Sequence, residues 1–158
     1  MDFDFSTQEK KVINEVRDFI RSESTRELLE ETHKIGNIYG GQEGRKFVKK
    51  FAAHGWLVPN WPEEYGGLGS SAVLNFAIRE EMAQAGVPLI FVAAHMAGPT
   101  IMHFGSDEMK KEWLLPIARG EVEFALGYSE PQAGSDLSAV DIRAVDNGDT
   151  FLMNGQKT

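Results

Sequence analysis

The chain has 158 residues, a formal net charge of −8 and no cysteine, and 42% of its residues are hydrophobic. The acidic balance argues against nucleic acid or an anionic membrane surface as the main partner, while the hydrophobic share is enough for a buried core. The lack of cysteine excludes disulfides, thiolate catalysis and zinc–thiolate sites, and it favours a reducing, cytoplasmic location.

The first 120 residues follow helical patterns. Ser6, with Glu9 three residues later, forms a capping box, and apolar residues follow on one helix face. Further helices are expected over residues 26–34, from residue 44 to a stop at Gly55, from Ser70 or Ser71 to residue 85, over residues 89–104, and from Ser106 to between residues 116 and 120.

The longest charge-free stretch spans residues 82–106 and contains most of the helix expected at 89–104. Glycine and proline interrupt it, and it holds glutamine and histidine, so it predicts a buried helix rather than a membrane span. Because residues 89–104 are apolar on most sides, we expect this helix at the centre of the helical domain. The acidic N-terminus predicts no export signal.

An aromatic loop is expected over residues 56–67, where proline and glycine prevent regular structure and two tryptophans and one tyrosine supply anchors. The following residues, Gly67 to Ala72, fit the Gly-x-Gly-x-x-Ala dinucleotide fingerprint. That fingerprint needs a strand before it, and here a loop precedes it, so we interpret it as a turn leading into a capped helix.

The pattern changes near residue 121. Strands are expected over residues 124–128, 140–145 and 150–153, and the turn sequence from Asp146 to Asp149 predicts a hairpin between the last two. A further strand would begin at residues 156–158. The sequence therefore predicts a mainly α chain, with a helical domain over residues 1–120 followed by the incomplete start of a β domain over residues 121–158.

The stretch from Gly127 to Asp136 is the strongest candidate for a binding site. Its proline corner, its adjacent alanine and glycine, and its two serine hydroxyls would present backbone donors and short hydroxyls to a large polar ligand. An ordinary connecting loop is the alternative. The histidines lack metal-ligand spacing and no Gly-x-Ser-x-Gly motif is present, so neither a metal site nor a serine nucleophile is expected.

The chain resembles the N-terminal part of the acyl-CoA dehydrogenases. The family signature is matched from Gly127 to Asp136 and by Ala139, except that Tyr128 stands where an aliphatic residue is usual. Other segments similar to the family are Gly55-Trp56 with residues 61–67, Glu80-Glu81, Gly98-Pro99, and the hairpin from Gly148 to Lys157.

This resemblance implies a helical N-terminal domain, a middle β domain and a C-terminal four-helix bundle, with flavin adenine dinucleotide (FAD) between the last two. It implies removal of two hydrogens from the α and β carbons of an acyl-CoA substrate in fatty acid metabolism. It also implies an electron-transfer flavoprotein or a similar acceptor, and a homo- or hetero-oligomeric full-length protein.

Carried over residue by residue, the resemblance implies that the Ser129 hydroxyl bonds the pyrimidine edge of the flavin and that Gly134 allows close approach of the backbone. Ser135 would contact both the flavin and the CoA portion of the substrate. The implied cofactor-binding residues are Leu126, Gly127, Tyr128, Ser129, Gly134 and Ser135. The implied substrate-binding residues are Ser135, Phe91, Ala94 and Met96.

The family's catalytic glutamate belongs to the C-terminal bundle, and no glutamate here matches it, so no catalytic residue is predicted. The family's Trp-Ile-Thr flavin segment would begin directly after Lys157. We therefore expect an N-terminal fragment with an incomplete FAD site that is inactive and retains flavin weakly or not at all. The alternatives are a flavin-free helical binding or interaction module, and an acyl-CoA oxidase or flavin monooxygenase of the same fold.

Overall fold

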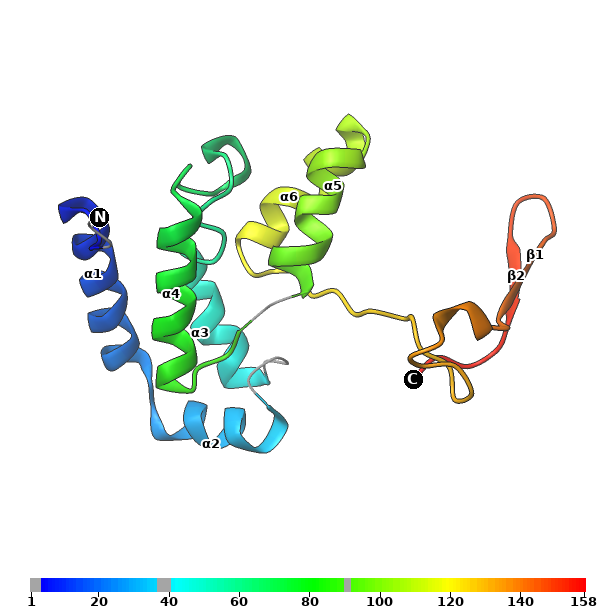
Figure 1. Ribbon diagram of the computed structural model, residues 1–158, viewed down its shortest axis with the longest axis horizontal. Coiled ribbons are helices and arrows are strands. Elements are labelled where there is room, and N and C mark those ends of the chain that lie inside the picture. Colours follow the sequence, from blue (N-terminus) through cyan, green and yellow to red (C-terminus); the bar gives the residue numbers. More distant parts are fainter. Residues whose placement is uncertain (1–3, 37–40, 90–91) are drawn as a thin grey trace. The chain divides into compact units, whose positions relative to one another are not determined.

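The computed structural model describes residues 4–36, 41–89 and 92–158, which form two compact units, Met1–Phe124 and Ala125–Thr158. The described part of the first unit is helical, and that of the second consists of loops and a two-stranded hairpin (Figure 1). The sequence pattern puts the domain boundary at residue 120. That boundary stays a prediction, because these units are defined only by contacts within this chain.

The first two helices begin at the expected residues, and the cap of the first was predicted from the sequence. In α1 (Thr7–Glu23), the Ser6 hydroxyl accepts a hydrogen bond from the backbone N–H of Glu9 at 3.3 Å, and the Glu9 carboxylate accepts one from the Ser6 N–H at 2.9 Å. These bonds satisfy N–H groups that have no partner inside the helix. In α2 (Arg26–Ile35), the Thr25 hydroxyl accepts a hydrogen bond from the Leu28 N–H at 3.2 Å.

The third helix, α3 (Gln42–Ala52), has no side-chain cap of its own, because Gly41 occupies the capping position. The Glu31 carboxylate of α2 replaces it, accepting hydrogen bonds from the N–H groups of Gly44 at 2.8 Å and Glu43 at 3.2 Å. A carboxylate also suits the positive end of the helix dipole. The helix starts two residues before the expected Gly44, because this cap comes from another helix and leaves no local sequence signal.

The helices α1 and α4 (Ala72–Ala85) lie side by side (Figure 1). Ser71 caps α4, as expected, with its hydroxyl accepting a hydrogen bond from the Leu74 N–H. The Arg17 guanidinium joins the two helices by donating to both oxygens of the Glu81 carboxylate at 2.8 and 2.7 Å.

The expected helix over residues 89–104 is not one regular helix. Residues 90 and 91 lie outside the described residues, and the remainder forms a π-helical turn η2 (Ala93–Ala97) followed by α5 (Gly98–Phe104). Pro99 has no N–H to donate and its ring crowds the preceding turn, so the α-helical hydrogen-bond register cannot run through this point. Ala93, Ala94 and Ile101 are buried, whereas Phe104 is 87% exposed.

A buried tryptophan explains the glycine at the start of α5. The Trp61 ring packs so closely against Gly98 that a Cβ on this residue would lie 2.1 Å from ring atom Cη2. Trp61 belongs to the aromatic loop, which contains one 3-10 turn, η1 (Glu63–Tyr65). The final helix, α6 (Asp107–Ala118), starts after the expected cap Ser106 and includes Pro116 near its end.

An aromatic cluster extends from the first unit's core to its surface. The Phe19 ring centroid is 5.6 Å from those of Phe47 and Trp56 and 5.7 Å from that of Phe51, and His54 stacks on Trp56 at 4.2 Å. Tilted and offset rings at such distances stabilise a core beyond the burial of their area. The largest fully buried side chains are Phe51, Leu28, Ile78, Leu114 and Ile117.

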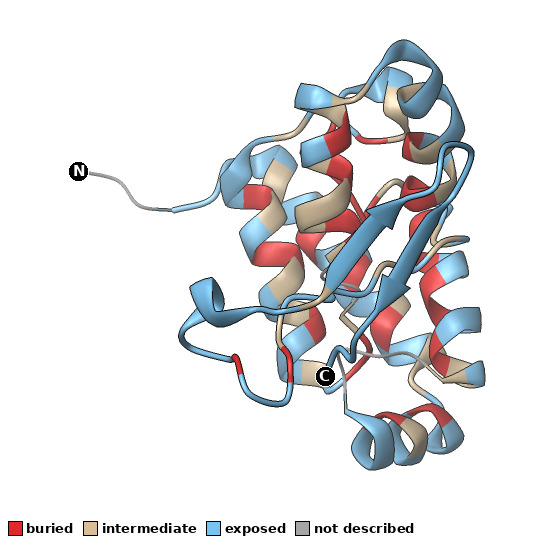
Figure 2. Cartoon of the chain, turned by 90° about the vertical axis from the view of Figure 1, so that its right-hand side faces the viewer, coloured by how far each residue is buried: buried red, intermediate tan, exposed pale blue. Residues whose placement is uncertain are grey.

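The second unit contains a short 3-10 turn, η3 (Leu137–Ala139), and an antiparallel hairpin of β1 (Arg143–Asp146) and β2 (Phe151–Asn154). In its register, Arg143 faces Asn154 and Asp146 faces Phe151. The Asn147 N–H donates to the Thr150 carbonyl at 2.9 Å, which confirms the expected hairpin turn. Every residue of both strands is exposed (Figure 2).

Two expected strands of the second unit are absent and one is shorter. Residues 124–128 and 156–158 carry no strand. A strand needs a continuous hydrogen-bonded neighbour, and only isolated bonds join these two segments. The strand expected from residue 140 begins at Arg143, because the N–H groups of Asp141 and Ile142 donate to a carboxylate instead of a strand. Among the described residues, no helix has the length and apolar character needed to cross a bilayer.

Candidate functional site

The segment from Gly127 to Asp136, here called the signature loop, folds around a tight turn. The Glu130 N–H donates to the Ala133 carbonyl at 2.8 Å, and the Ala133 N–H donates back to the Glu130 carbonyl at 3.0 Å. This pair of bonds leaves Pro131 and Gln132 at the corner, where the fixed backbone angle of proline suits a turn. The proline corner that the sequence predicts is therefore confirmed.

The Glu130 side chain lies at the centre of this unit and is only 3% exposed. Its oxygen Oε1 accepts hydrogen bonds from the Ile142 N–H at 3.1 Å and from Lys157 Nζ at 3.0 Å. Its oxygen Oε2 accepts from the Asp141 N–H and from Gln132 Nε2, both at 2.7 Å. These bonds, led by that from Asp141 and followed by that from Lys157, lower the pKa of Glu130 to about 2, so the carboxylate is ionised at neutral pH.

The same lysine connects the signature loop to residues 156–158. Lys157 Nζ donates to the Tyr128 carbonyl at 3.0 Å as well as to Glu130, and the Thr158 N–H donates to the Ser129 carbonyl at 3.0 Å. Residues 157 and 158 therefore lie beside residues 128 and 129. Sequence reasoning missed this arrangement, because it joins residues 27 to 29 positions apart and no local motif reports it.

The proposed cofactor-binding residues lie on an open surface of the second unit. Leu126 is 44% exposed and Tyr128 is 57% exposed, while Ser129 is half-buried. A Cβ built on Gly134 would meet no atom within 4 Å. Within the described part of the chain, nothing accepts a hydrogen bond from the Ser129 hydroxyl or from the N–H groups of Gly134 and Ser135.

These free donors fit the polar edge of a flavin ring, which carries carbonyl oxygens and ring nitrogens that accept hydrogen bonds. Gly134 leaves room for a flat group to approach the backbone, because no side chain fills the space above it. The residues present are therefore compatible with FAD in chemistry and in access.

The proposed substrate-binding residues are divided between the two units. Ser135 is exposed in the second unit, whereas Ala94 and Met96 lie on η2 of the first. Ala94 is fully buried in the helical core, and Met96 is half-buried. Phe91 lies outside the described residues.

His95 is a partly buried polar residue between Ala94 and Met96. Burial, and to a smaller extent the nearby charge of Arg79, lower its pKa to about 4. Its imidazole is therefore neutral at neutral pH. Elsewhere in the parts of the chain that the structure describes, no group of three or more potential ligand side chains could hold a metal ion.

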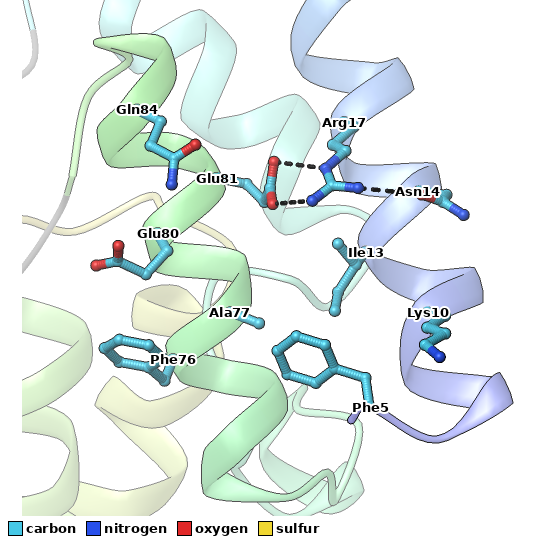
Figure 3. Close-up of a pocket in the computed structure, with 10 residues that line it drawn as sticks. All are labelled: Phe5, Lys10, Ile13, Asn14, Arg17, Phe76, Ala77, Glu80, Glu81 and Gln84. Carbon is cyan, nitrogen blue, oxygen red and sulfur yellow. Dashed lines mark hydrogen bonds and ion pairs between the residues drawn. The ribbon is translucent and has the colours of Figure 1, made fainter. Parts of the chain in front are cut away.

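A separate groove of about 480 Å³ lies between α1 and α4 (Figure 3). Phe5, Ile13 and Phe76 line one part of it, and the Arg17–Glu81 pair lies at the other. No local sequence pattern predicts this groove, because a surface between two helices depends on their packing.

Comparison with known proteins identifies similar chains along the whole sequence. The family model described as acyl-CoA dehydrogenase, N-terminal domain, matches residues 6–121. The acyl-CoA dehydrogenase FadE26 of Mycobacterium tuberculosis is 37% identical over 99% of this chain and 40% of its own length.

Two solved structures extend the comparison. The Tcur3481-Tcur3483 steroid ACAD has a TM-score of 0.84 and 36% identity over 99% of this chain and 40% of that one. An acyl-CoA dehydrogenase complexed with FAD from Bacillus anthracis has a TM-score of 0.76 and 30% identity over 98% of this chain and 26% of that one. The chain thus spans about 40% of the length of the curated relative FadE26.

Proposed function

The chain belongs to the acyl-CoA dehydrogenase family, and from this premise we propose that the whole protein is a flavin-dependent oxidoreductase acting on an acyl-CoA thioester. The reaction would remove hydrogens from the α and β carbons of the acyl group. The observation that supports this most is the open signature loop, where the Ser129 hydroxyl and the N–H groups of Gly134 and Ser135 have no partner among the described residues.

We propose that these donors hold the flavin. Bound FAD would supply the acceptor for the hydride that leaves the β carbon. The Ser129 hydroxyl would donate to the pyrimidine edge and stabilise the negative charge that develops there, as fixed donors do in other active sites. Leu126, Gly127 and Tyr128 would lie along the ring, and Gly134 would admit it close to the backbone.

The remaining roles depend on the resemblance. Ser135 would also contact the CoA portion, and Phe91, Ala94 and Met96 would line part of the acyl cavity. Ala94 contacts protein in the helical core, so its proposed role needs an opening of that packing or an indirect effect on the cavity. The glutamate that removes the α proton would lie in the part of the whole protein that matches the relatives beyond this chain.

We further propose an acyl group that carries a ring system, and a second, different subunit. The support is the name of one similar structure, the Tcur3481-Tcur3483 steroid ACAD, which is 36% identical over 99% of this chain. An electron-transfer flavoprotein or a similar protein would accept the electrons. These are proposals for the whole protein.

The test uses the full-length protein that contains this chain, purified together with any subunit that copurifies. We expect bound FAD, and anaerobic bleaching of the flavin by a steroid-side-chain acyl-CoA in preference to a straight-chain one. Absence of bound FAD after reconstitution would contradict the proposal and favour a flavin-free binding module. Rapid reoxidation of the reduced flavin by oxygen would instead favour an oxidase or monooxygenase.

Ser129→Ala tests the central contact. Loss of one hydrogen bond of about 0.5–1.5 kcal/mol weakens FAD binding roughly 2- to 12-fold. Ser138→Ala is the matched control, because the Ser138 hydroxyl donates only to Asp136. Equal FAD dissociation constants for Ser129→Ala and the wild type would remove Ser129 from the cofactor site.

A further inference from the structure

The buried Glu130 carboxylate has no part in the chemistry proposed above, yet it has the densest set of hydrogen bonds in the second unit. Its donors come from three separate stretches of chain: Gln132, the backbone of residues 141 and 142, and Lys157. Each oxygen accepts two bonds, so about four acceptor positions of an ionised carboxylate are all used.

This arrangement excludes a role for Glu130 in proton transfer. A general base needs a free lone pair within reach of the proton that it removes. The Glu130 oxygens have none free, and the side chain is buried. The very low pKa agrees, because a carboxylate with a pKa of about 2 is a weak base.

Glu130 and its partner Lys157 lie beside two of the residues that would contact the flavin, Tyr128 and Ser129. Glu130 directly follows Ser129 in the chain, and Lys157 bridges the Glu130 carboxylate and the Tyr128 carbonyl. The Thr158 N–H holds the Ser129 carbonyl. Substitution of Glu130 would remove the ion pair that fixes Lys157, and with it the support that Lys157 gives to the Tyr128 carbonyl beside Ser129.

We propose that Glu130 is a positioning residue, whose carboxylate ties the signature loop to residues 141–142 and to Lys157 and so fixes the Ser129 hydroxyl before FAD binds. This inference rests on the proposed function. Fixing a binding loop in advance raises affinity, because the cost of ordering it is met during folding rather than during binding. Glu130 would thus act on the cofactor without touching it.

Glu130→Gln is the sharpest substitution, because it keeps the size of the side chain and removes its charge. The amide NH₂ would face two donors at one of the former oxygen positions. In the full-length protein depleted of FAD and titrated with it, we expect binding to weaken roughly 10- to 100-fold. Asp149→Asn, which removes an exposed charge at the hairpin turn of the same unit, should leave affinity unchanged.

A double-mutant cycle separates positioning from a general structural effect. If Glu130 fixes Ser129, then Ser129→Ala should weaken FAD binding by less than about 2-fold in the Glu130→Gln background, against roughly 2- to 12-fold in the wild type. Additive effects of the two substitutions would overturn the proposal. Hydrogen exchange of the Asp141 and Ile142 amides without FAD should be faster in Glu130→Gln, and unchanged exchange would also overturn it.

Lys157 provides a second route if Glu130→Gln does not fold. Lys157→Gln removes the bridge to Tyr128 but leaves the backbone donors of Glu130 in place, so FAD binding should weaken. Lys157→Arg keeps a charged donor at this position, so its FAD affinity should stay close to that of the wild type. Equal affinity for Lys157→Gln and the wild type would refute the positioning role. Failure of the wild-type protein itself to bind FAD would instead refute the proposed function.

Discussion

Substitution of Gly134 by alanine tests whether the flavin approaches the signature loop closely. The φ angle of Gly134 is outside the left-handed region, so alanine can adopt the same backbone conformation. A Cβ at this position would meet no atom of the chain within 4 Å. The added methyl group would therefore point into the open space that we assign to the cofactor.

The two expected effects have opposite signs. Alanine restricts the unfolded chain, so the free energy of unfolding should stay constant or rise by about 0.4–1 kcal/mol. If the ring packs against the backbone, a methyl group forced into that contact costs about 1–3 kcal/mol, which weakens FAD binding roughly 5- to 150-fold. We therefore expect Gly134→Ala to be as stable as the wild type or more stable, and to bind FAD more weakly.

The assay combines thermal unfolding without FAD and an FAD titration of the same full-length protein. Gly148→Ala is the matched control, because Gly148 has a φ angle of +87° at the hairpin turn. Alanine there should lower the free energy of unfolding by about 1–2 kcal/mol and leave FAD affinity unchanged. Unchanged FAD affinity in Gly134→Ala would refute the assignment of Gly134 to the cofactor site.

Two further predictions concern packing and protonation. Gly98→Ala places a Cβ 2.1 Å from the buried Trp61 ring, so the free energy of unfolding measured with denaturant should fall by about 1–3 kcal/mol. Adding Trp61→Phe should restore part of that free energy. An unchanged unfolding midpoint in Gly98→Ala would contradict this packing. Folding lowers the pKa of Glu130 from an ordinary 4.5 to about 2. Its contribution to the free energy of unfolding is therefore fully present above pH 4.5 and is lost as the pH falls through about 2. NMR shifts of the Asp141 and Ile142 amides should show a midpoint near 2 that is absent in Glu130→Gln, and a midpoint near 4.5 would contradict the bonds described.

Local capping signals predicted much of the helical unit. Ser6, Ser71 and Ser106 each start a helix at the expected place, because the cap and the groups that it satisfies are within three residues of each other. The hairpin turn after Asp146 is equally local and was predicted for the same reason.

Features that depend on distant residues were not predictable in this way. The cap that Glu31 provides for α3 comes from another helix, and the packing of Trp61 on Gly98 joins residues 37 positions apart. The signature loop was recognised by its composition and by its match to the family signature, but the hydrogen bonds of the Glu130 carboxylate were not predicted, because its partners lie up to 27 residues away.

The hairpin of β1 and β2 has a practical consequence for any preparation of residues 1–158. Both outer edges of this two-stranded sheet lack a neighbouring strand in the described chain, and Val145, Phe151, Leu152 and Met153 present apolar side chains to water. Such edges attract strands from other molecules, so the sample would be prone to self-association. Aggregates or dimers in that sample would reflect pairing of exposed strand edges rather than the quaternary structure of a longer protein that contains this chain.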